Sequence, residues 1–322
     1  MKTNEVLFDK FSKNLQNICK TLKFELEDKF QNEAYICPLS FKIHTKDGLS
    51  NEYEDQLTIE HIPPESLNGK GLCLTNRILN SKAGHSLDLD MQNHIMLREF
   101  HEGVSSLKTK VYLDNVKMDV CIDFTVKDKP LFKFTYKSRH QGIERVEKKI
   151  ISKEKVNLEM TLPKDNRNTS ISFLRTAYLY AFANLGYSLL FGVTKLVNQN
   201  FNLIRKQINN PMDIIIKDIV LLNKNLDDLP LGLSIVYEPK EFRSLLVVLE
   251  IKTDIKNWRY AMFLPGPDDY GFTAINNIKT HFSKHERINF QYSTLSKIDI
   301  TDSNESNQYY KRWEKLNDFY RE

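Results

Sequence analysis

The segment 58–88 holds the side chains of this sequence that are best suited to chemistry. Glu60 and His61 are adjacent, and Asn80, His85 and Asp88 follow a turn that contains glycines. Of these, Asp88 is more typical of a charge on a helix surface. Carboxylate and amide oxygens, with imidazole nitrogen, suit a divalent cation such as Mg²⁺ or Mn²⁺ when waters fill the remaining positions. A histidine outside the ligand set can act as a general base. The pattern therefore favours metal-assisted hydrolysis.

Two short strands and a helix must position these groups. Residues 57–59 and 72–74 are predicted strands, and a helix is expected over about 76–100 with a kink near its glycine. Adjacent strand residues point to opposite faces, so Glu60 and His61 separate unless the strand departs from regular alternation at the prolines that end it. We expect Glu60 to hold the metal and His61 to remain free as a base.

This order of strand, glycine-containing turn, strand and helix resembles the HNH (ββα-metal) endonucleases. The resemblance covers about residues 35–100 and rests on Glu60-His61-Ile-Pro63, Asn68-Gly-Lys70, Leu72–Thr75 and Asn80-Ser-Lys-Ala-Gly-His85. It implies that His61 is the catalytic general base and that Glu60 is a metal ligand. Asn80, or His85 a turn later, would complete the catalytic metal site, which would hold one Mg²⁺ or Mn²⁺. Lys70, Arg77 and Lys82 would contact phosphates.

The sequence departs from the family at the structural zinc. Many members with this spacing carry two cysteine pairs, and here those positions read Cys37-Pro-Leu-Ser40 and Asn76-Arg-Ile-Leu79. One thiol remains of four, so a four-thiolate site is excluded and we expect no structural zinc. Packing of an N-terminal helix would then stabilise the module. A family Asn that orients the general base falls near Gly71.

Composition excludes several classes of protein. The chain has 322 residues, of which 41% are hydrophobic and 27% charged, the usual mix for a globular protein. Its 11 Gly and 10 Pro exclude collagen-like and low-complexity chains. Four separated cysteines without a CxxC pair suit a reducing cytoplasm. The uncharged run Ala177–Thr194 contains Tyr, Asn and Gly, which favours a buried helix broken near Gly186 over a membrane span.

We expect an α+β protein with two domains. Residues 1–104 would form the HNH-like module with an amphipathic helix over 4–31, and residues 105–322 a larger mixed α+β domain that recognises substrate, partner or signal. Basic residues are concentrated between Lys127 and Lys155, which is typical of a solvated surface and also of a phosphate-binding one. Further elements are predicted at 111–113, 118–126, 131–136, 156–162, 170–193, 196–208, 233–237, 244–251, 259–264 and 306–320.

The resulting hypothesis is a cytoplasmic, metal-dependent endonuclease or nickase that hydrolyses DNA, with no membrane partner. By analogy with stand-alone HNH proteins, it would serve phage defence or a mobile element. Two alternatives remain open. The fold could be catalytically weakened and bind nucleic acid or protein, or the substrate could be RNA. Residues 105–322 could also bind a protein partner.

Overall fold

The computed structural model shows a mixed α+β protein made of several small sheets. It describes residues 2–30, 33–126, 130–136, 142–152, 155–160, 167–191, 197–224, 226–285, 289–295 and 297–318. The chain divides into unit 1, which is Met1–Asp88 with Arg167–Glu322, and unit 2, which is Leu89–Asn166. This division differs from the expected boundary at 104/105, because the N-terminal segment packs with the C-terminal half of the chain.

The helices of unit 1 bury aromatic and aliphatic faces. They are α1 (Thr3–Leu22), α2 (Arg77–Gly84), α5 (Arg167–Leu185), α6 (Tyr187–Phe191), α7 (Gln199–Asn209), α8 (Thr273–Phe282) and α9 (Gln308–Asp318). The helix expected over 4–31 ends at Leu22, since Lys23 takes a left-handed conformation with φ of 52° and a 3-10 turn follows only at Asp28–Phe30. Phe11 of α1 stacks on Phe182 of α5.

The apolar run forms two buried helices, as the sequence predicts. α5 and α6 are separated at Gly186, whose φ of +59° suits glycine. A Cβ there would lie 2.2 Å from Oδ1 of Asn14, which accepts a hydrogen bond from the Tyr187 backbone N–H. Residues 192–194 lie outside the described part of the chain. Among the residues that are described, no helix has both the length and the apolar character needed to cross a membrane.

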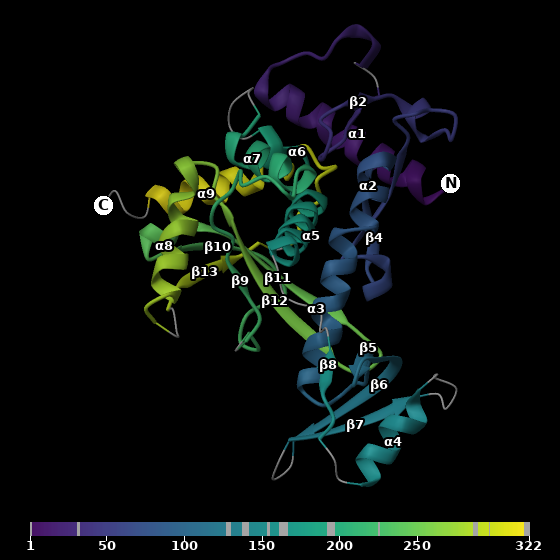
Figure 1. Ribbon diagram of the computed structural model, residues 1–322. Helices are drawn as coiled ribbons and strands as arrows, with labels where there is room; N and C mark the ends of the chain where they lie inside the picture. Colours follow the sequence, from purple (N-terminus) through teal and green to yellow (C-terminus); the bar gives the residue numbers. More distant parts are fainter. Residues whose placement is uncertain are drawn as a thin grey trace. The chain divides into compact units, whose positions relative to one another are not determined.

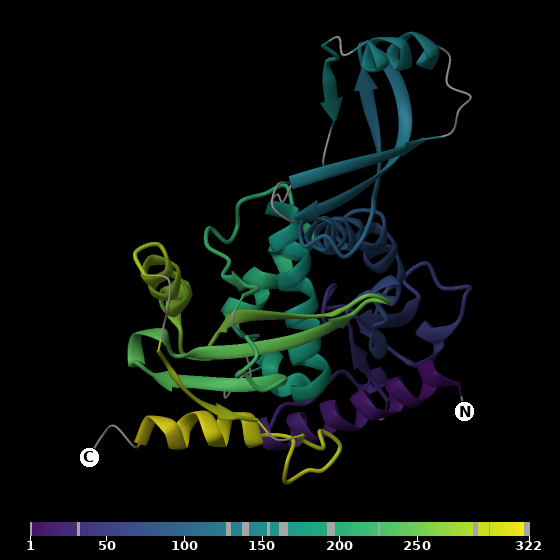
Figure 2. The ribbon, with the colours of Figure 1, turned by 90° about the horizontal axis from the view of Figure 1, so that it is seen from below.

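A five-stranded antiparallel sheet forms the other side of the unit 1 core. Its order is β13-β10-β11-β12-β9, and its strands are β9 (Leu221–Leu222), β10 (Gly232–Glu238), β11 (Ser244–Lys252), β12 (Asn257–Pro265) and β13 (Gln291–Thr294). α5 packs along β11 and β12 (Figure 1). The segment before α9 lies beside α1, where Asn14 and Asn17 donate to backbone carbonyls (Figure 2).

A hairpin carries the segment that the sequence singles out. β3 (Leu57–Ile62) pairs with β4 (Lys70–Asn76), and α2 follows at once. The single helix expected over 76–100 is two helices, because the chain turns at His85 and Ser86 before α3 (Leu87–His101) begins. A smaller pair, β1 (Tyr35–Ile36) with β2 (Ile43–His44), precedes the hairpin.

Unit 2 is a four-stranded antiparallel sheet with a small core of its own. Its order is β7-β6-β5-β8, and its strands are β5 (Leu107–Leu113), β6 (Val116–Val126), β7 (Pro130–Tyr136) and β8 (Leu158–Met160). α4 (Ile143–Ile151), which the sequence analysis did not predict, buries Ile143 and Val146 on one face of this sheet (Figure 2).

Candidate functional site

Glu60 of β3 lies in the interior of unit 1. It is 2% exposed, and its Oε2 accepts a hydrogen bond of 2.8 Å from the Thr75 hydroxyl. Nη2 of Arg175, from α5, donates to the same oxygen at 2.8 Å. The side chains of Glu60 and Arg175 are each 3% exposed, so the two form a buried ion pair.

Arg175 contacts two further acceptors. Its Nη1 lies 3.3 Å from Oδ1 of Asp88, and its Nη2 lies 3.5 Å from Oδ1 of Asn80. Its Nε is buried and has no acceptor in the described structure. We call Glu60, Thr75, Asn80, Asp88 and Arg175 the Glu60 cluster. One guanidinium is thus held by two carboxylates and an amide oxygen.

The hairpin and α2 fix the geometry of this cluster. Antiparallel pairing aligns Thr58 with Thr75 and Glu60 with Cys73, so these side chains share one face of the hairpin. The amide nitrogen of Asn80 donates to the Thr58 hydroxyl and to the Ile59 carbonyl, each at 3.2 Å. These bonds hold α2 against β3 and turn the amide oxygen of Asn80 toward Arg175.

A hydroxyl on α5 anchors the helix that carries Arg175. Tyr178, one turn further along, is buried and donates to the Pro38 carbonyl at 2.7 Å. Tyr35, in β1, donates to the Leu74 carbonyl of β4 at 2.6 Å. The backbone around residues 35–38 therefore links α5 to the hairpin, and this linkage sets the approach of Arg175 to Glu60.

His61 lies outside the Glu60 cluster. The pairing register shifts between Glu60 and His61, where Leu72 of β4 is left without a partner in β3. The irregularity therefore lies in β4, not at the prolines that end β3, where the sequence analysis allowed one. The half-buried imidazole of His61 lies over Gly71, where an added Cβ would be 3.8 Å from Nε2. Ile59 flanks Gly71 on the same side, whereas Glu60 bonds to Thr75. The residue at 71 has no side chain with which to orient the imidazole.

The remaining predicted site residues are exposed. His85 caps the C-terminus of α2, and within the described residues no hydrogen bond or ion pair joins it to the Glu60 cluster. Lys70 begins β4, and Nζ of Lys82 donates to the Asn209 carbonyl at 3.4 Å. Arg77 begins α2 and donates to Gln56 at 3.4 Å. The structure therefore brings Glu60 and Asn80 together and leaves His85 apart from them.

Burial dominates the electrostatics of the two carboxylates. Desolvation raises the pKa of Glu60 above its ordinary value of 4.5, although Arg175 and the Thr75 hydroxyl act in the opposite direction. Desolvation also raises the pKa of Asp88, again opposed by Arg175. Two carboxylates share one guanidinium, so the ionised cluster keeps an excess of negative charge. Such an excess in a buried place favours a further positive charge or a proton.

The donor set can be tested against the divalent ion that the resemblance implies. Oxygen atoms of Glu60 and Asn80 contact Nη2 of Arg175, and an oxygen of Asp88 contacts the neighbouring Nη1. An all-oxygen set suits Mg²⁺ or Mn²⁺. The guanidinium of Arg175 occupies the space next to these oxygens. Across the described part of the chain, no group of three or more His, Cys, Asp or Glu residues could hold a metal. The two carboxylates therefore need the amide oxygen of Asn80 as a third ligand. A cation could bind to these oxygens only if Arg175 moved away.

Hydrogen bonds join the two loops that correspond to the cysteine pairs. Sγ of Cys37 accepts from the backbone N–H of Ser40 at 3.4 Å and from that of Asn76 at 3.3 Å. Asn76 caps α2, because its Oδ1 accepts from the N–H groups of Ile78 and Leu79. The loops meet through a thiol, an amide side chain and the backbone.

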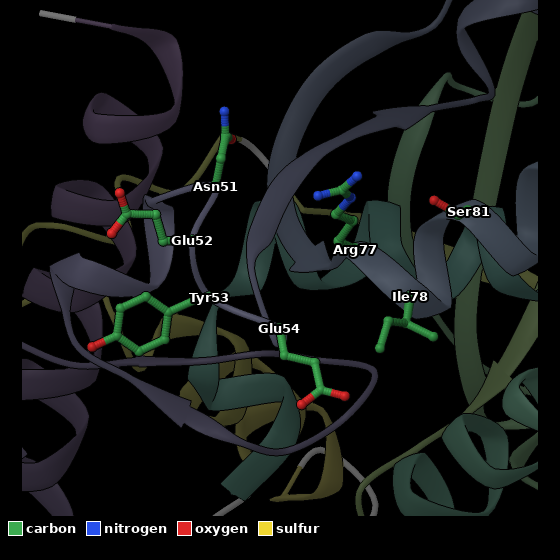
Figure 3. Close-up of a pocket in the computed structure, with 7 residues that line it drawn as sticks. All are labelled: Asn51, Glu52, Tyr53, Glu54, Arg77, Ile78 and Ser81. Atoms are coloured by element: carbon green, nitrogen blue, oxygen red, sulfur yellow. The ribbon is translucent and has the colours of Figure 1, made fainter.

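An open hollow of about 520 Å³ lies beside the N-terminal end of α2. Arg77, Ile78 and Ser81 project into it from the helix, and the loop 51–54 lines its other side (Figure 3). That loop contributes both Glu52 and Glu54. The charges around the hollow are therefore mixed, and no member of the Glu60 cluster lines it.

Three members of the cluster were not predicted as site residues. Arg175 is buried in an apolar helix, where the sequence analysis expected only core, and Thr75 lies in a predicted strand. Asp88 has the appearance of a helix-surface charge in the sequence, but its side chain is 17% exposed and ion-paired. Arg175 is the one charged residue in the helix predicted over 170–193, and this was the available signal, because a buried charge requires a partner.

Comparison with protein-family models, with curated proteins and with solved structures finds no match to this chain.

Proposed function

We propose that the chain is an HNH-type phosphodiesterase that cleaves DNA with the help of a divalent cation. One observation carries the proposal: Glu60 and Asn80, which the resemblance assigns as metal ligands, converge on one positive charge, at 2.8 and 3.5 Å from the same Arg175 nitrogen. The order of β3, β4 and α2 supports it, since it matches the order of the family module.

Each residue of the site would have a separate role in the reaction. Glu60 and Asn80 would hold Mg²⁺ or Mn²⁺, with Asp88 beside them. The ion would supply stabilisation of the negative charge that develops on the scissile phosphate. His61 would accept the proton of the attacking water through its imidazole. Lys70, Arg77 and Lys82 are exposed on the same hairpin and helix and would position the phosphate backbone.

The test is cleavage of supercoiled plasmid with Mg²⁺, with Mn²⁺ and with EDTA. We expect metal-dependent nicking or linearisation that disappears in His61→Ala and in Glu60→Gln. His101→Ala, which changes an exposed histidine of unit 2, is the matched control and should keep the activity. Cleavage that survives both site variants would refute the assignment, and a parallel RNA substrate tests the sugar preference.

A second candidate is a protein that binds nucleic acid through this fold without cleaving it. Arg175 favours this candidate, because its guanidinium already forms an ion pair with Glu60, the proposed metal ligand. Gel-shift binding in EDTA, with no cleavage at any Mn²⁺ concentration by the wild type or by Arg175→Met, would support it. Metal-dependent cleavage by either protein would exclude it.

A further inference from the structure

Arg175 and a divalent ion cannot use the Glu60 cluster together. Nη2 of Arg175 lies 2.8 Å from Oε2 of Glu60, which is hydrogen-bond distance, and a ligated ion would need that oxygen at only 2.0–2.6 Å. Two positive groups on one buried carboxylate would also repel each other strongly, since the surroundings are poorly polarisable. Binding of one therefore requires departure of the other.

Arg175 is held incompletely for a buried charge. A guanidinium has five N–H donors, and the acceptors of Arg175 are Glu60, Asp88 and Asn80, the last at the long distance of 3.5 Å. Its buried Nε has no acceptor within the described residues. Arg175 also lines a cavity of about 20 Å³ between α2, α5 and α7, which is space for about one water molecule.

We infer that Arg175 is a built-in competitor for the divalent cation, so that the chain rests in a latent, metal-excluding state. The latency of the enzyme rests on the proposed function. The competition between Arg175 and the cation concerns metal binding alone and can be tested without it. Removal of the guanidinium leaves the oxygens of Glu60, Asp88 and Asn80 beside the space that its two terminal nitrogens occupied, and this oxygen set carries two negative charges. The chain would then bind Mn²⁺ where the wild type binds it poorly.

The experiment is a titration with Mn²⁺, followed by the electron paramagnetic resonance signal of the free ion. We expect Arg175→Met to bind one Mn²⁺ about tenfold tighter or more than the wild type does. The added site should disappear in Glu60→Gln/Arg175→Met. Arg175→Lys keeps a positive charge on a shorter and more mobile group, and its affinity should lie between the two. Lys46→Met, at a surface pair with Asp9, is the control and should match the wild type.

Two results would overturn the inference. One is a Glu60-dependent Mn²⁺ site in the wild type as tight as that of Arg175→Met, and the other is no gain in affinity in either Arg175 variant. If Arg175→Met does not fold, Arg175→Lys decides the question by the same comparison.

Plasmid cleavage separates the two proposals. Tighter Mn²⁺ binding without cleavage in any protein refutes the nuclease alone, whereas cleavage at equal Mn²⁺ concentration in wild type and variant refutes the competition alone.

Discussion

Replacement of Arg175 by methionine tests whether the buried pair is the structural centre of unit 1. The change keeps a long side chain and removes the only basic group that is bonded to Glu60 in the described structure. Loss of one partner from a buried pair costs about 3–5 kcal/mol, because the other charge stays in the interior unpaired. For a unit of roughly 240 residues, this corresponds to a fall in Tm of about 6–20 °C.

The assay is thermal and urea unfolding followed by tryptophan fluorescence. Both tryptophans of the chain, Trp258 and Trp313, belong to unit 1, so the signal reports the unit that contains the pair. The protonation of Glu60 gives a second readout, which is the dependence of stability on pH. Arg175 lowers the pKa of Glu60 against the effect of burial, so its loss raises that pKa further. The stability of Arg175→Met should therefore keep falling with rising pH, by up to about 1.4 kcal/mol per pH unit, to higher pH than that of the wild type.

Glu60→Gln/Arg175→Met is the decisive comparison, because it removes both charges of the fully buried pair and leaves only the partly exposed Asp88 without its cation. It should recover most of the loss, since replacing a whole buried pair is often close to neutral. Lys46→Met, at an exposed surface pair, should leave the midpoint unchanged. The reasoning is refuted if Arg175→Met loses no more stability than this surface control, or if its stability depends on pH in the same way as that of the wild type.

Three further predictions concern the same unit. Burial raises the pKa of Glu60 above 4.5, so its contribution to stability is present below that value and is lost as the pH rises through the folded-state pKa. The stability of wild type relative to Glu60→Gln in urea titrations should therefore decline as the pH rises above 4.5, and an increase would contradict the prediction. Asn76→Ala removes the cap of α2 and should cost about 1 kcal/mol by chemical denaturation, whereas Ser81→Ala on the exposed face of α2 should not. Gly186→Ala places a Cβ 2.2 Å from Asn14 Oδ1 at a positive φ and should lower the free energy of unfolding by about 1–3 kcal/mol; an unchanged Tm would show that the break between α5 and α6 relaxes freely.

The helices and strands near the site could be read from local pattern. Alternating apolar residues and a glycine-containing turn predict the hairpin, and β3 and β4 extend the predicted strands by only a few residues at their ends. The break at Gly186 was predictable for the same reason, because glycine in a long apolar run is a local signal. α4 was missed although its four apolar residues, Ile143, Val146, Ile150 and Ile151, stand at helical spacing among five charged ones, because the sequence analysis read this basic stretch only as a charged surface.

The domain boundary could not be derived in this way. Composition changes after residue 104, but the structure pairs the first 88 residues with the chain from Arg167 onward. Such pairings join segments that are distant in sequence, and no local propensity encodes them. The same reason explains Asp88, whose appearance as a surface charge reverses once Arg175 lies beside it.

By itself, the sequence determined which groups are available for chemistry and the local elements that present them. Glu60, His61 and Asn80 stand on a strand and a helix because short-range patterning places them there. Tertiary structure alone decided what Glu60 binds. Arg175 is 115 residues away along the chain, and it reaches the carboxylate only because α5 packs against the hairpin. A buried carboxylate requires a positive partner or a proton, and the packing of α5 supplies the guanidinium of Arg175.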